Sequence, residues 1–413
     1  MIGHAAVNLA RLQADLDALS EFREPDQPGW TRRVFSEPYI RSRQWLASTM
    51  REAGLRVRRD AAGNLIGVLP SPARGGRPAI VTGSHTDTVA GGGRFDGPLG
   101  VLAAVEVARC IKASGRPLEH ELRVVDFVGE EPNEFGISCV GSRAVAGNLS
   151  GDHLALRDPS GRTLADAIES IGGDPDRTGD SAWRAEEVHA FVELHIEQGP
   201  VLEDVGIPVG IVSGIAGIVR LHMTFEGEAG HAGTTPMGAR HDALVAAADT
   251  VLAIERIASR GDGVGTAGRI EARPGALNVI PGHVELWAEL RHASTDWLEA
   301  SRIGVEDAVR ASGDRRGVQT KVDLLSRTDP VICSEEVRAA MSDALAELGL
   351  ASRTLPSGAG HDTVQMARLG PVGMLFVPSV GGRSHCPEEL TLPQHLEAGA
   401  SALMATLRVL DAR

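Results

Sequence analysis

The chain has 413 residues, of which 42% are hydrophobic and 23% are charged, as in ordinary globular proteins. The formal net charge of -14 argues against sequence-independent binding to nucleic acid, because such binding depends on Lys and Arg neutralising phosphates. Aromatic residues make up only 3% of the chain, which leaves little material for stacking platforms under unpaired bases.

The sequence carries no recognisable signal for export or membrane insertion. Its first residues, "MIGHAAVNLARLQADLDALSEF", follow helical spacing and lack the basic and apolar regions of a signal peptide. No apolar run reaches the roughly 18 residues that a membrane helix needs. The four cysteines are scattered, which favours reduced thiols over a disulfide framework. We therefore expect a cytoplasmic protein with no membrane and no nucleic-acid partner.

Helices and strands alternate in the first half of the chain. "EPYIRSRQWLASTMREAG" predicts a helix ending at Gly54, and "LRVRRDAAGNLIGVLP" predicts a hairpin. Next come a buried strand "PAIVTGSH", a helix "GPLGVLAAVEVARCIKASG" and a strand "HELRVVDFVGEE". This order predicts a parallel sheet with crossover helices. "HAFVELHIEQGP" repeats the pattern of a strand followed by polar residues.

The pattern changes near residue 213 and returns near residue 330. Between these points the segments follow the order β-α-β-β-α-β, which is typical of a ferredoxin-like sandwich. The length also favours two domains. We predict a mixed, largely parallel α/β sheet flanked by helices, formed by residues 1–213 and 330–413. Residues 214–329 form an inserted ferredoxin-like α+β domain in this prediction.

Histidines and acidic residues gather where the predicted parallel strands end. Ligands of open α/β sheets bind at this edge, and imidazoles with carboxylates are the ligands of Zn²⁺-like cations. Several carboxylates without a cation would repel one another. The sequence therefore predicts a metal site built from these segments. The residues are His85, Asp87 and Asp96; Glu130 and Glu131; His195 and Glu197; and His385 in the late segment "GGRSHCPEE".

The glycine-rich segment "VAGGGRFDG" has a role in this prediction. It must turn sharply to bring Asp96 back beside His85, and glycine permits the backbone angles of such a return. Asp87 follows His85 by two residues and so faces the same way along a strand. We expect its carboxylate to accept a hydrogen bond from the second ring nitrogen of His85.

Each pattern also has a simpler interpretation. Taken alone, a His-x-Asp pair on a strand ligates a metal in roughly one case in five. The pair Glu130 and Glu131 alone is typical of a solvated loop, and His195 alone is an ordinary strand residue. The metal site is favoured because all of them fall at strand ends in a chain with only 14 histidines.

Seven motifs, in order, resemble a known family over essentially the whole chain. It is the zinc-dependent hydantoinase/carbamoylase family of amidohydrolases, which is related to aminoacylases and carboxypeptidases with two metal ions. Its members include N-carbamoyl-L-amino-acid hydrolases, allantoate amidohydrolases and β-ureidopropionases. The motifs are "GSHTDTVAGGGRFDGPLGVLAAVEV", "GEEPNEFG", "ELHIEQGPVLE", "GHAGTTPMGARHDAL", "NVIPG" with "ELRH", "SGAGHD" and "SHCPEE".

The resemblance implies two divalent metal ions per subunit, with Zn²⁺ expected first and Mn²⁺, Co²⁺ or Ni²⁺ as alternatives. His85 and His195 would each bind one of the two metal sites, with Asp96 bridging. Glu131 and His385 would hold the second site. Glu130, which is not used as a ligand, would act as the general base. Asp87 is expected among the catalytic residues, together with Glu130 and His231.

The resemblance also implies the residues that bind the substrate. His231 would polarise the carbonyl, and Asn278 and Arg291 would hold a carboxylate. Without the resemblance, an exposed turn residue is about as plausible for His231, and a solvated charge is the better interpretation of Arg291. The inserted domain would be a lid and the contact of a homodimer. The remaining substrate-binding residues are Gln198, Gly360 and His361.

The predicted function is hydrolysis of the carbamoyl C–N bond of N-carbamoyl-L-amino acids or related ureido acids, with a metal-activated hydroxide as nucleophile. One alternative is an N-acyl-amino-acid hydrolase or dipeptidase with the same metals. Another is a non-catalytic binding protein of this fold. The run "EEPNEFGISCVGSR" departs from the family pattern, because Glu134, close to Pro132 and Asn133, stands where Arg is usual. We expect this departure to affect which substrate is bound and not the binding of metal. Cys386 is interpreted as a spectator thiol.

Overall fold

The computed structural model describes residues 6–73 and 76–413. The chain forms two compact units. Unit 1 comprises Met1–Ser213 and Cys333–Arg413, and unit 2 comprises Gly214–Ile332. The sequence placed the two boundaries after residues 213 and 329, and the observed boundaries follow residues 213 and 332.

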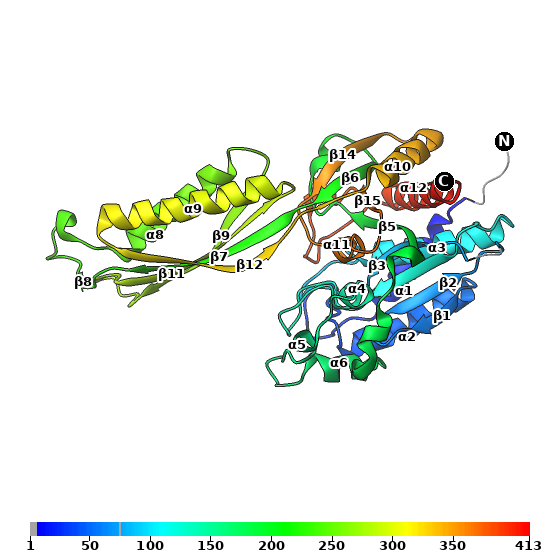
Figure 1. The fold of residues 1–413 in the computed structure, drawn as a ribbon, viewed down its shortest axis with the longest axis horizontal. Helices are drawn as coiled ribbons and strands as arrows, with labels where there is room; N and C mark the ends of the chain where they lie inside the picture. Colours follow the sequence, from blue (N-terminus) through cyan, green and yellow to red (C-terminus); the bar gives the residue numbers. More distant parts are fainter. Residues whose placement is uncertain (1–5, 74–75) are drawn as a thin grey trace. The chain divides into compact units, whose positions relative to one another are not determined.

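The large sheet has nine strands in the order β1-β2-β4-β3-β5-β15-β6-β13, and β14 pairs with β6 (Figure 1). The pairs β4/β3, β3/β5 and β5/β15 are parallel, and the outer pairs are antiparallel. The predicted mixed α/β sheet is therefore confirmed. The strands are β1 (Arg56–Arg59), β2 (Leu65–Leu69), β3 (Ala79–His85), β4 (Leu122–Phe127), β5 (Val188–Ile196), β6 (Val209–Ile215), β13 (Val331–Ile332), β14 (Ser352–Ser357) and β15 (Val372–Val377).

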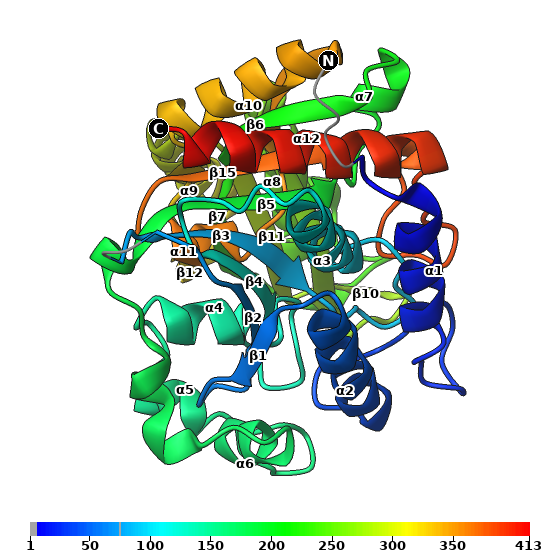
Figure 2. The same cartoon turned by 90° about the vertical axis from the view of Figure 1, so that its right-hand side faces the viewer.

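Helices cover both faces of this sheet, as Figure 2 shows for α3 and α12 on one side and α4 and α11 on the other. Helix α3 is apolar on nearly all sides because it packs between the sheet and both α1 and α12. The helices are α1 (Leu9–Ser20), α2 (Glu37–Glu52), α3 (Pro98–Ala113), α4 (Val140–Val145), α5 (Gly151–Leu154), α6 (Leu164–Ser170), α7 (Val201–Asp204), α10 (Glu335–Leu348), α11 (Thr363–Met366) and α12 (Pro393–Asp411), with short 3₁₀ turns at Pro175–Ser181, Ala185–Glu187 and Val380–Gly382.

Unit 2 contains a four-stranded antiparallel sheet in the order β12-β7-β11-β9, against which α8 and α9 pack. In chain order this is β-α-β-β-α-β with strand order 4-1-3-2, the predicted ferredoxin-like sandwich. Alternate residues of β7 are buried, as expected for a sheet covered on one face. The elements are β7 (Gly217–Glu226), β8 (Gly230–His231), a 3₁₀ turn (Met237–Ala239), α8 (Ala243–Ala258), β9 (Val264–Arg273), β10 (Val279–Ile280), β11 (His283–His292), α9 (Thr295–Arg316) and β12 (Gln319–Thr328).

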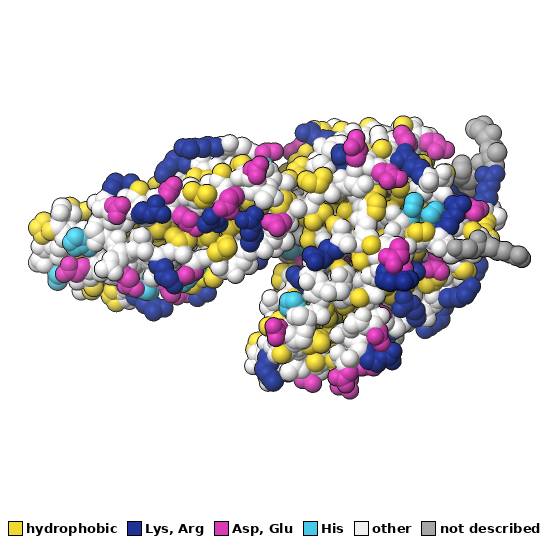
Figure 3. Space-filling view, in the orientation of Figure 1, with side chains coloured by type: hydrophobic (Ala, Val, Ile, Leu, Met, Phe, Trp, Pro, Cys, Tyr) yellow, Lys and Arg dark blue, Asp and Glu magenta, His cyan; other side chains and the backbone are white. Residues whose placement is uncertain are grey.

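On the face shown in Figure 3, basic and acidic side chains are interspersed, and no stripe of one sign appears on that face. Among the described residues, no helix has the length and apolar character needed to cross a membrane.

The sheet order explains where a site forms. Strands β4, β3, β5 and β15 are adjacent and parallel, so their carboxyl ends lie along one edge. His85 is the last residue of β3, and His195 is the last but one of β5. Glu130 and Glu131 follow β4, and His385 lies in the segment after β15.

Candidate metal centre

Two groups of candidate metal ligands in unit 1 share one carboxylate. The first group is His85, Asp96 and His195, and the second is Asp96, Glu131 and His385. In each group, ligand atoms from the three residues lie within 4.8 Å of one another. Asp96 belongs to both groups and has two carboxylate oxygens, so it can bridge two cations. These are the five residues that the resemblance implied as ligands.

The two oxygens of Asp96 face different histidines. Oδ1 lies 3.2 Å from His195 Nε2 and 3.9 Å from His85 Nε2. Oδ2 lies 3.3 Å from His385 Nε2, which is also 3.2 Å from Glu131 Oε1. The carboxylate therefore lies between the two positions that a pair of cations would take.

The histidine rings at strands β3 and β5 are oriented for ligation through Nε2. Nδ1 of His85 donates to the main-chain oxygen of Asp87 at 3.0 Å, and Nδ1 of His195 donates to that of Ile196 at 2.9 Å. Such bonds fix the tautomer that leaves Nε2 free to ligate a metal. His195 Nε2 is buried and has no partner of hydrogen-bond geometry, although Asp96 is near. An orphaned imidazole nitrogen of this kind fits a bound cation.

Asp87 supports the site in a different way from the one expected. Its carboxylate lies 3.7 Å from His85 Nδ1, and the bond from that nitrogen goes to the main-chain carbonyl of Asp87 instead. The carboxylate oxygens accept from the main-chain nitrogens of Glu130 at 3.4 Å and Glu131 at 3.2 Å. Burial raises the pKa of Asp87 to about 6, against the opposing effect of His85. Asp87 thus connects the end of β3 to the acidic loop after β4.

The return of the chain to His85 requires glycine at one position. Gly97 has φ +84°, in the left-handed region, and a Cβ there would lie 2.4 Å from Cε1 of His85. The ring of a candidate ligand therefore occupies the space that any side chain at this position would need.

Opposing charges dominate the electrostatics of the cluster. Burial raises the pKa of Asp96, but His195, His385 and His85 outweigh it and hold this pKa well below its usual range. Burial lowers the pKa of His195, but Asp96 raises it to about 9. Hydrogen bonds to Asp96 and Glu131 raise the pKa of His385 to about 11. The carboxylates thus attract positive charge, which a bound cation would supply.

Glu130 lies beside the cluster and belongs to neither ligand group. Its Oε2 is 3.7 Å from His85 Nε2, and its Oε1 is 3.8 Å from Cys139 Sγ. Burial, Glu131 and Asp362 raise the pKa of Glu130 well above its usual range. A buried carboxyl with a raised pKa next to a metal centre can accept and return a proton.

Three residues hold Asp96 in place. Gln198 Nε2 donates to its Oδ2 at 2.7 Å, and Ser384 Oγ donates to the same oxygen at 2.5 Å. Glu389 accepts from the main-chain nitrogen of Asp96 at 3.1 Å and from Ser384 at 2.9 Å. Sequence reasoning gave Gln198 a substrate contact and no role to Ser384 or Glu389. Ser384 and Glu389 could have been found from their position inside the motif "GGRSHCPEE", which also contains His385.

A second layer lies behind His195. The ring of His361 packs edge-on against it at 4.6 Å between centroids, and its Nε2 lies 2.8 Å from Ser357 Oγ. His361 is 1% exposed and follows Gly360. Glu193 forms a third candidate ligand group with these two histidines. The sequence analysis did not identify Glu193. The signal that could have found it is a charged residue inside the otherwise apolar strand "FVELHI".

The predicted substrate-binding residues of the inserted domain lie at two separate positions in unit 2. His231 pairs with Val279 between β8 and β10, and the Ala232 nitrogen donates to the Asn278 oxygen at 3.0 Å. Arg291 lies near the other end of β11, opposite Ile218. From His283, the end of β11 near β8, to Arg291 the strand extends about 26 Å.

The fold and the site define the class to which the protein belongs. A mixed α/β sheet that brings histidines and carboxylates from four segments around one shared aspartate is the arrangement of a metal-dependent hydrolase. Residues 81–409 match the model of Peptidase family M20/M25/M40. The chain belongs to this family.

Relatives of known name agree with the resemblance seen in the motifs. The chain is 43% identical over 403 residues to an N-carbamoyl-L-amino acid amidohydrolase of Geobacillus stearothermophilus, covering 96% of this chain and 97% of that one. It is 36% identical over 404 residues to a ureidoglycolate hydrolase of Oryza sativa subsp. japonica, covering 95% and 82%. A crystal structure of a hydantoinase/carbamoylase family amidase from Burkholderia multivorans superposes with a TM-score of 0.92 at 32% identity, covering 98% and 99%. The predicted family is confirmed.

Proposed function

We propose that this protein hydrolyses the carbamoyl C–N bond of N-carbamoyl-L-amino acids or related ureido acids. The observation that carries the proposal is the position of Glu130, a buried carboxyl outside both ligand groups and 3.7 Å from the ligand nitrogen of His85. The relatives support the substrate class, because one is named for N-carbamoyl-L-amino acids and another for ureidoglycolate.

The donor set fits a pair of divalent cations. Three imidazoles and two carboxylates converge, one imidazole nitrogen is orphaned, and Asp96 is shared. Nitrogen and oxygen donors of this kind suit Zn²⁺ best, with Mn²⁺, Co²⁺ or Ni²⁺ as alternatives. Bound here, two such cations would lower the pKa of a shared water so that it ionises near neutral pH.

Glu130 carries the proton in this proposal. It takes one from the attacking water and delivers it to the nitrogen of the amino acid, which leaves as an amine. The other product is carbamate, which decomposes to carbon dioxide and ammonia. Asp87 holds Glu130 and Glu131 through their main-chain nitrogens, so base and ligand keep a constant spacing.

His231, Asn278 and Arg291 would contact the substrate from the inserted unit. His231 and Asn278 lie near the His283 end of β11, and Arg291 lies about 26 Å along that strand from His283, so a single copy of unit 2 does not bring all three to one small molecule. We propose that the protein is a homodimer joined through unit 2. One subunit then supplies Arg291 and its partner supplies His231 and Asn278.

The test is a substrate panel with controlled metals. Ammonia release is measured with several N-carbamoyl-L-amino acids, allantoate, ureidoglycolate and N-carbamoyl-β-alanine, after loading with Zn²⁺, Mn²⁺ or Co²⁺. The proposal requires turnover of at least one of them. Glu130→Gln should retain both metal ions and lose turnover by about three orders of magnitude, because the proton carrier is gone.

A second candidate function uses the same site. The matching family model is described as a peptidase family, which favours an N-acyl-amino-acid hydrolase or dipeptidase. Acetylated amino acids and dipeptides, followed by detection of the free amine, therefore belong in the panel. Cleavage of these compounds together with silence on every ureido compound would replace the first function by the second.

A further inference from the structure

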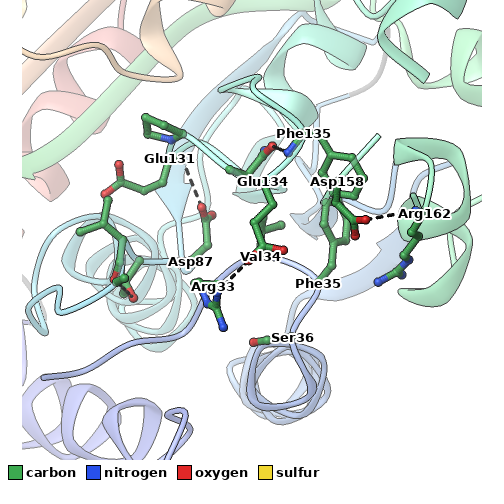
Figure 4. Close-up of a pocket in the computed structure, with 15 residues that line it drawn as sticks. Arg33, Val34, Phe35, Ser36, Asp87, Glu131, Glu134, Phe135, Asp158 and Arg162 are labelled. Carbon is green, nitrogen blue, oxygen red and sulfur yellow. Dashed lines mark hydrogen bonds and ion pairs between the residues drawn. The ribbon is translucent and has the colours of Figure 1, made fainter. Parts of the chain in front are cut away.

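A cavity of about 430 Å³ adjoins the metal centre within unit 1. Asp87 and Glu131 form one side of it, and Figure 4 shows Phe35, Glu134 and Phe135 among the residues on its other sides. The volume is that of a small-molecule pocket. Glu131 is a candidate metal ligand and also lines the cavity. The side chain of a molecule bound at the metals could therefore reach into this cavity.

The apolar wall of the cavity is rigid. The rings of Phe35 and Phe135 meet edge to face with centroids 5.8 Å apart, and both residues are 7% exposed. Phe35 has φ +65°, a left-handed backbone that bulky residues rarely adopt. Packing must hold it there, which favours a surface built to contact a ligand. Val34, Val89 and Pro132 extend this wall.

The charged rim of the cavity has an excess of negative charge at Glu134. Its Oε1 accepts from Arg33 Nη1 at 2.7 Å, but Arg33 also makes three hydrogen bonds to the carboxylate of Glu24. One guanidinium therefore serves two carboxylates. Within the described parts of the chain, Arg33 is the sole hydrogen-bond partner of the Glu134 carboxylate, whose side chain is 54% exposed.

The other rim carboxylate, Asp158, already accepts three hydrogen bonds at its Oδ1. Asp158 accepts from both the nitrogen and the hydroxyl of Ser160 and from the main-chain nitrogen of Arg162. The guanidinium of Arg162 donates to Ser170 Oγ and to the main-chain oxygen of Asp166. Of these two rim carboxylates, Glu134 accepts one hydrogen bond and Asp158 accepts three, so Glu134 has the greater capacity to bind a donor from a ligand.

We propose that this cavity is the subsite for the substrate's side chain, and that Glu134 selects chains with an apolar stem and a cationic or hydrogen-bond-donating end. A side chain that ends in a carboxylate is disfavoured by repulsion from the same group. The inference rests on the proposed function, because it assumes an amino acid derivative bound at the metals.

The experiment compares three substrates of similar length: N-carbamoyl-L-lysine, N-carbamoyl-L-norleucine and N-carbamoyl-L-glutamate. In Glu134→Gln, the ratio of kcat/KM for the lysine over the norleucine derivative should fall about fivefold, as expected for a half-exposed charge. In Glu134→Arg, the preference for the lysine over the glutamate derivative should reverse. Glu121→Gln is the matched control, since Glu121 pairs with Arg123 at 2.9 Å and lies outside this cavity. Its ratios should equal those of the wild type.

Unchanged ratios in both Glu134 variants would overturn the subsite. Circular dichroism checks that each variant is folded. If Glu134→Arg does not fold, the kcat/KM ratios of Glu134→Gln alone test the proposal. The same three side chains on N-acetyl amino acids separate the two proposals. Cleavage of the acetyl series alone, with ratios that depend on Glu134, keeps the subsite and rejects the carbamoyl function. Silence on both series overturns both.

Discussion

Asp96 is the residue on which both candidate cation positions depend. Its two oxygens face different histidines, and Gln198 and Ser384 hold one of them in place. Glu389 fixes the main chain at the same point. A change at this residue therefore removes a ligand from two ions at once, whereas a change at His385 removes a ligand from one.

We predict that Asp96→Ala abolishes metal loading. Both ions lose a ligand, and His195 and His385 lose the carboxylate that attracts positive charge. Elemental analysis of the purified variant measures this directly. Asp60→Asn is the control, because Asp60 is buried but bonded to Asn64 and belongs to neither ligand group. Two retained ions per chain in Asp96→Ala would contradict the bridging role.

A histidine pair at the ends of β4 and β5 opposite the site should make stability depend on pH. His120 and His189 stack with centroids 4.2 Å apart, near the starts of β4 and β5. Burial and the neighbouring His120 lower the pKa of His189 below the usual histidine value. The unfolded chain therefore takes up this proton at a higher pH than the folded one. Stability is lost as the pH falls through the usual histidine range towards the lowered value.

We predict that His189→Gln loses less thermal stability than the wild type between about pH 7.5 and about pH 5.5. Glutamine keeps a donor for the Leu410 carbonyl, which His189 Nε2 contacts at 3.2 Å, but it does not titrate. Differential scanning fluorimetry at several pH values measures the change. His241→Gln, at an exposed position, should keep the pH dependence of the wild type. Identical curves for His189→Gln and wild type would reject the prediction.

At the scale of elements, the segment between β3 and α3 sets the geometry of the site. It leaves β3 after His85, passes through a run of glycines and returns with Asp96 at the start of α3. Gly97 ends this segment with a left-handed backbone and lies against the ring of His85. The close approach of this backbone to the ligand is what the glycine permits.

We predict that Gly97→Ala weakens metal binding by at least about tenfold, because the added Cβ displaces the His85 ring and the left-handed backbone is strained. Competition with a fluorescent chelator measures the affinity. Gly91→Ala provides the matched control: Gly91 also has positive φ, at +72°, but a Cβ there meets only a Pro28 side-chain atom at 3.7 Å. Equal loss of affinity in both variants would assign the effect to backbone strain alone.

At the scale of the whole molecule, unit 2 exposes much apolar surface. Exposed apolar side chains are buried when two subunits associate. This supports the proposal that unit 2 joins two subunits, and the separation of Arg291 from His231 supplies a reason for it. The exposed large apolar residues of unit 2 include Leu244, Val245, Leu252, Val264, Ile270, Leu277, Ile303, Leu324 and Leu325.

We predict complementation between two inactive variants. His231→Ala and Glu130→Gln are each inactive alone, but a mixed dimer has one site with both native residues. Co-expression should therefore restore about one quarter of the wild-type activity, since half the dimers are mixed and each has one working site. Asp96→Ala with Glu130→Gln is the control pair and should stay inactive, because both changes fall in one metal centre. Activity no higher in the first pair than in the second would reject the shared site.

The types and order of the site residues followed from the sequence alone. His85, Glu131 and His195 stand at the ends of apolar strands, and alternation of strands and helices places such ends on one edge. The need for glycine before α3 could also be predicted from the sequence, because a chain that returns over few residues needs unusual backbone angles. These features depend on local spacing, which a linear sequence records.

Other features depended on the tertiary structure, because they join residues far apart in the chain. Glu389 meets Asp96 across 293 positions, and no local pattern encodes that contact. The carbonyl of Asp87, not its carboxylate, binds His85 because the carboxylate is occupied by the loop after β4. The separation of Arg291 from the end of β11 near His231 followed from the observed length of that strand. Sheet order and register set distances in space, and only the folded chain determines them.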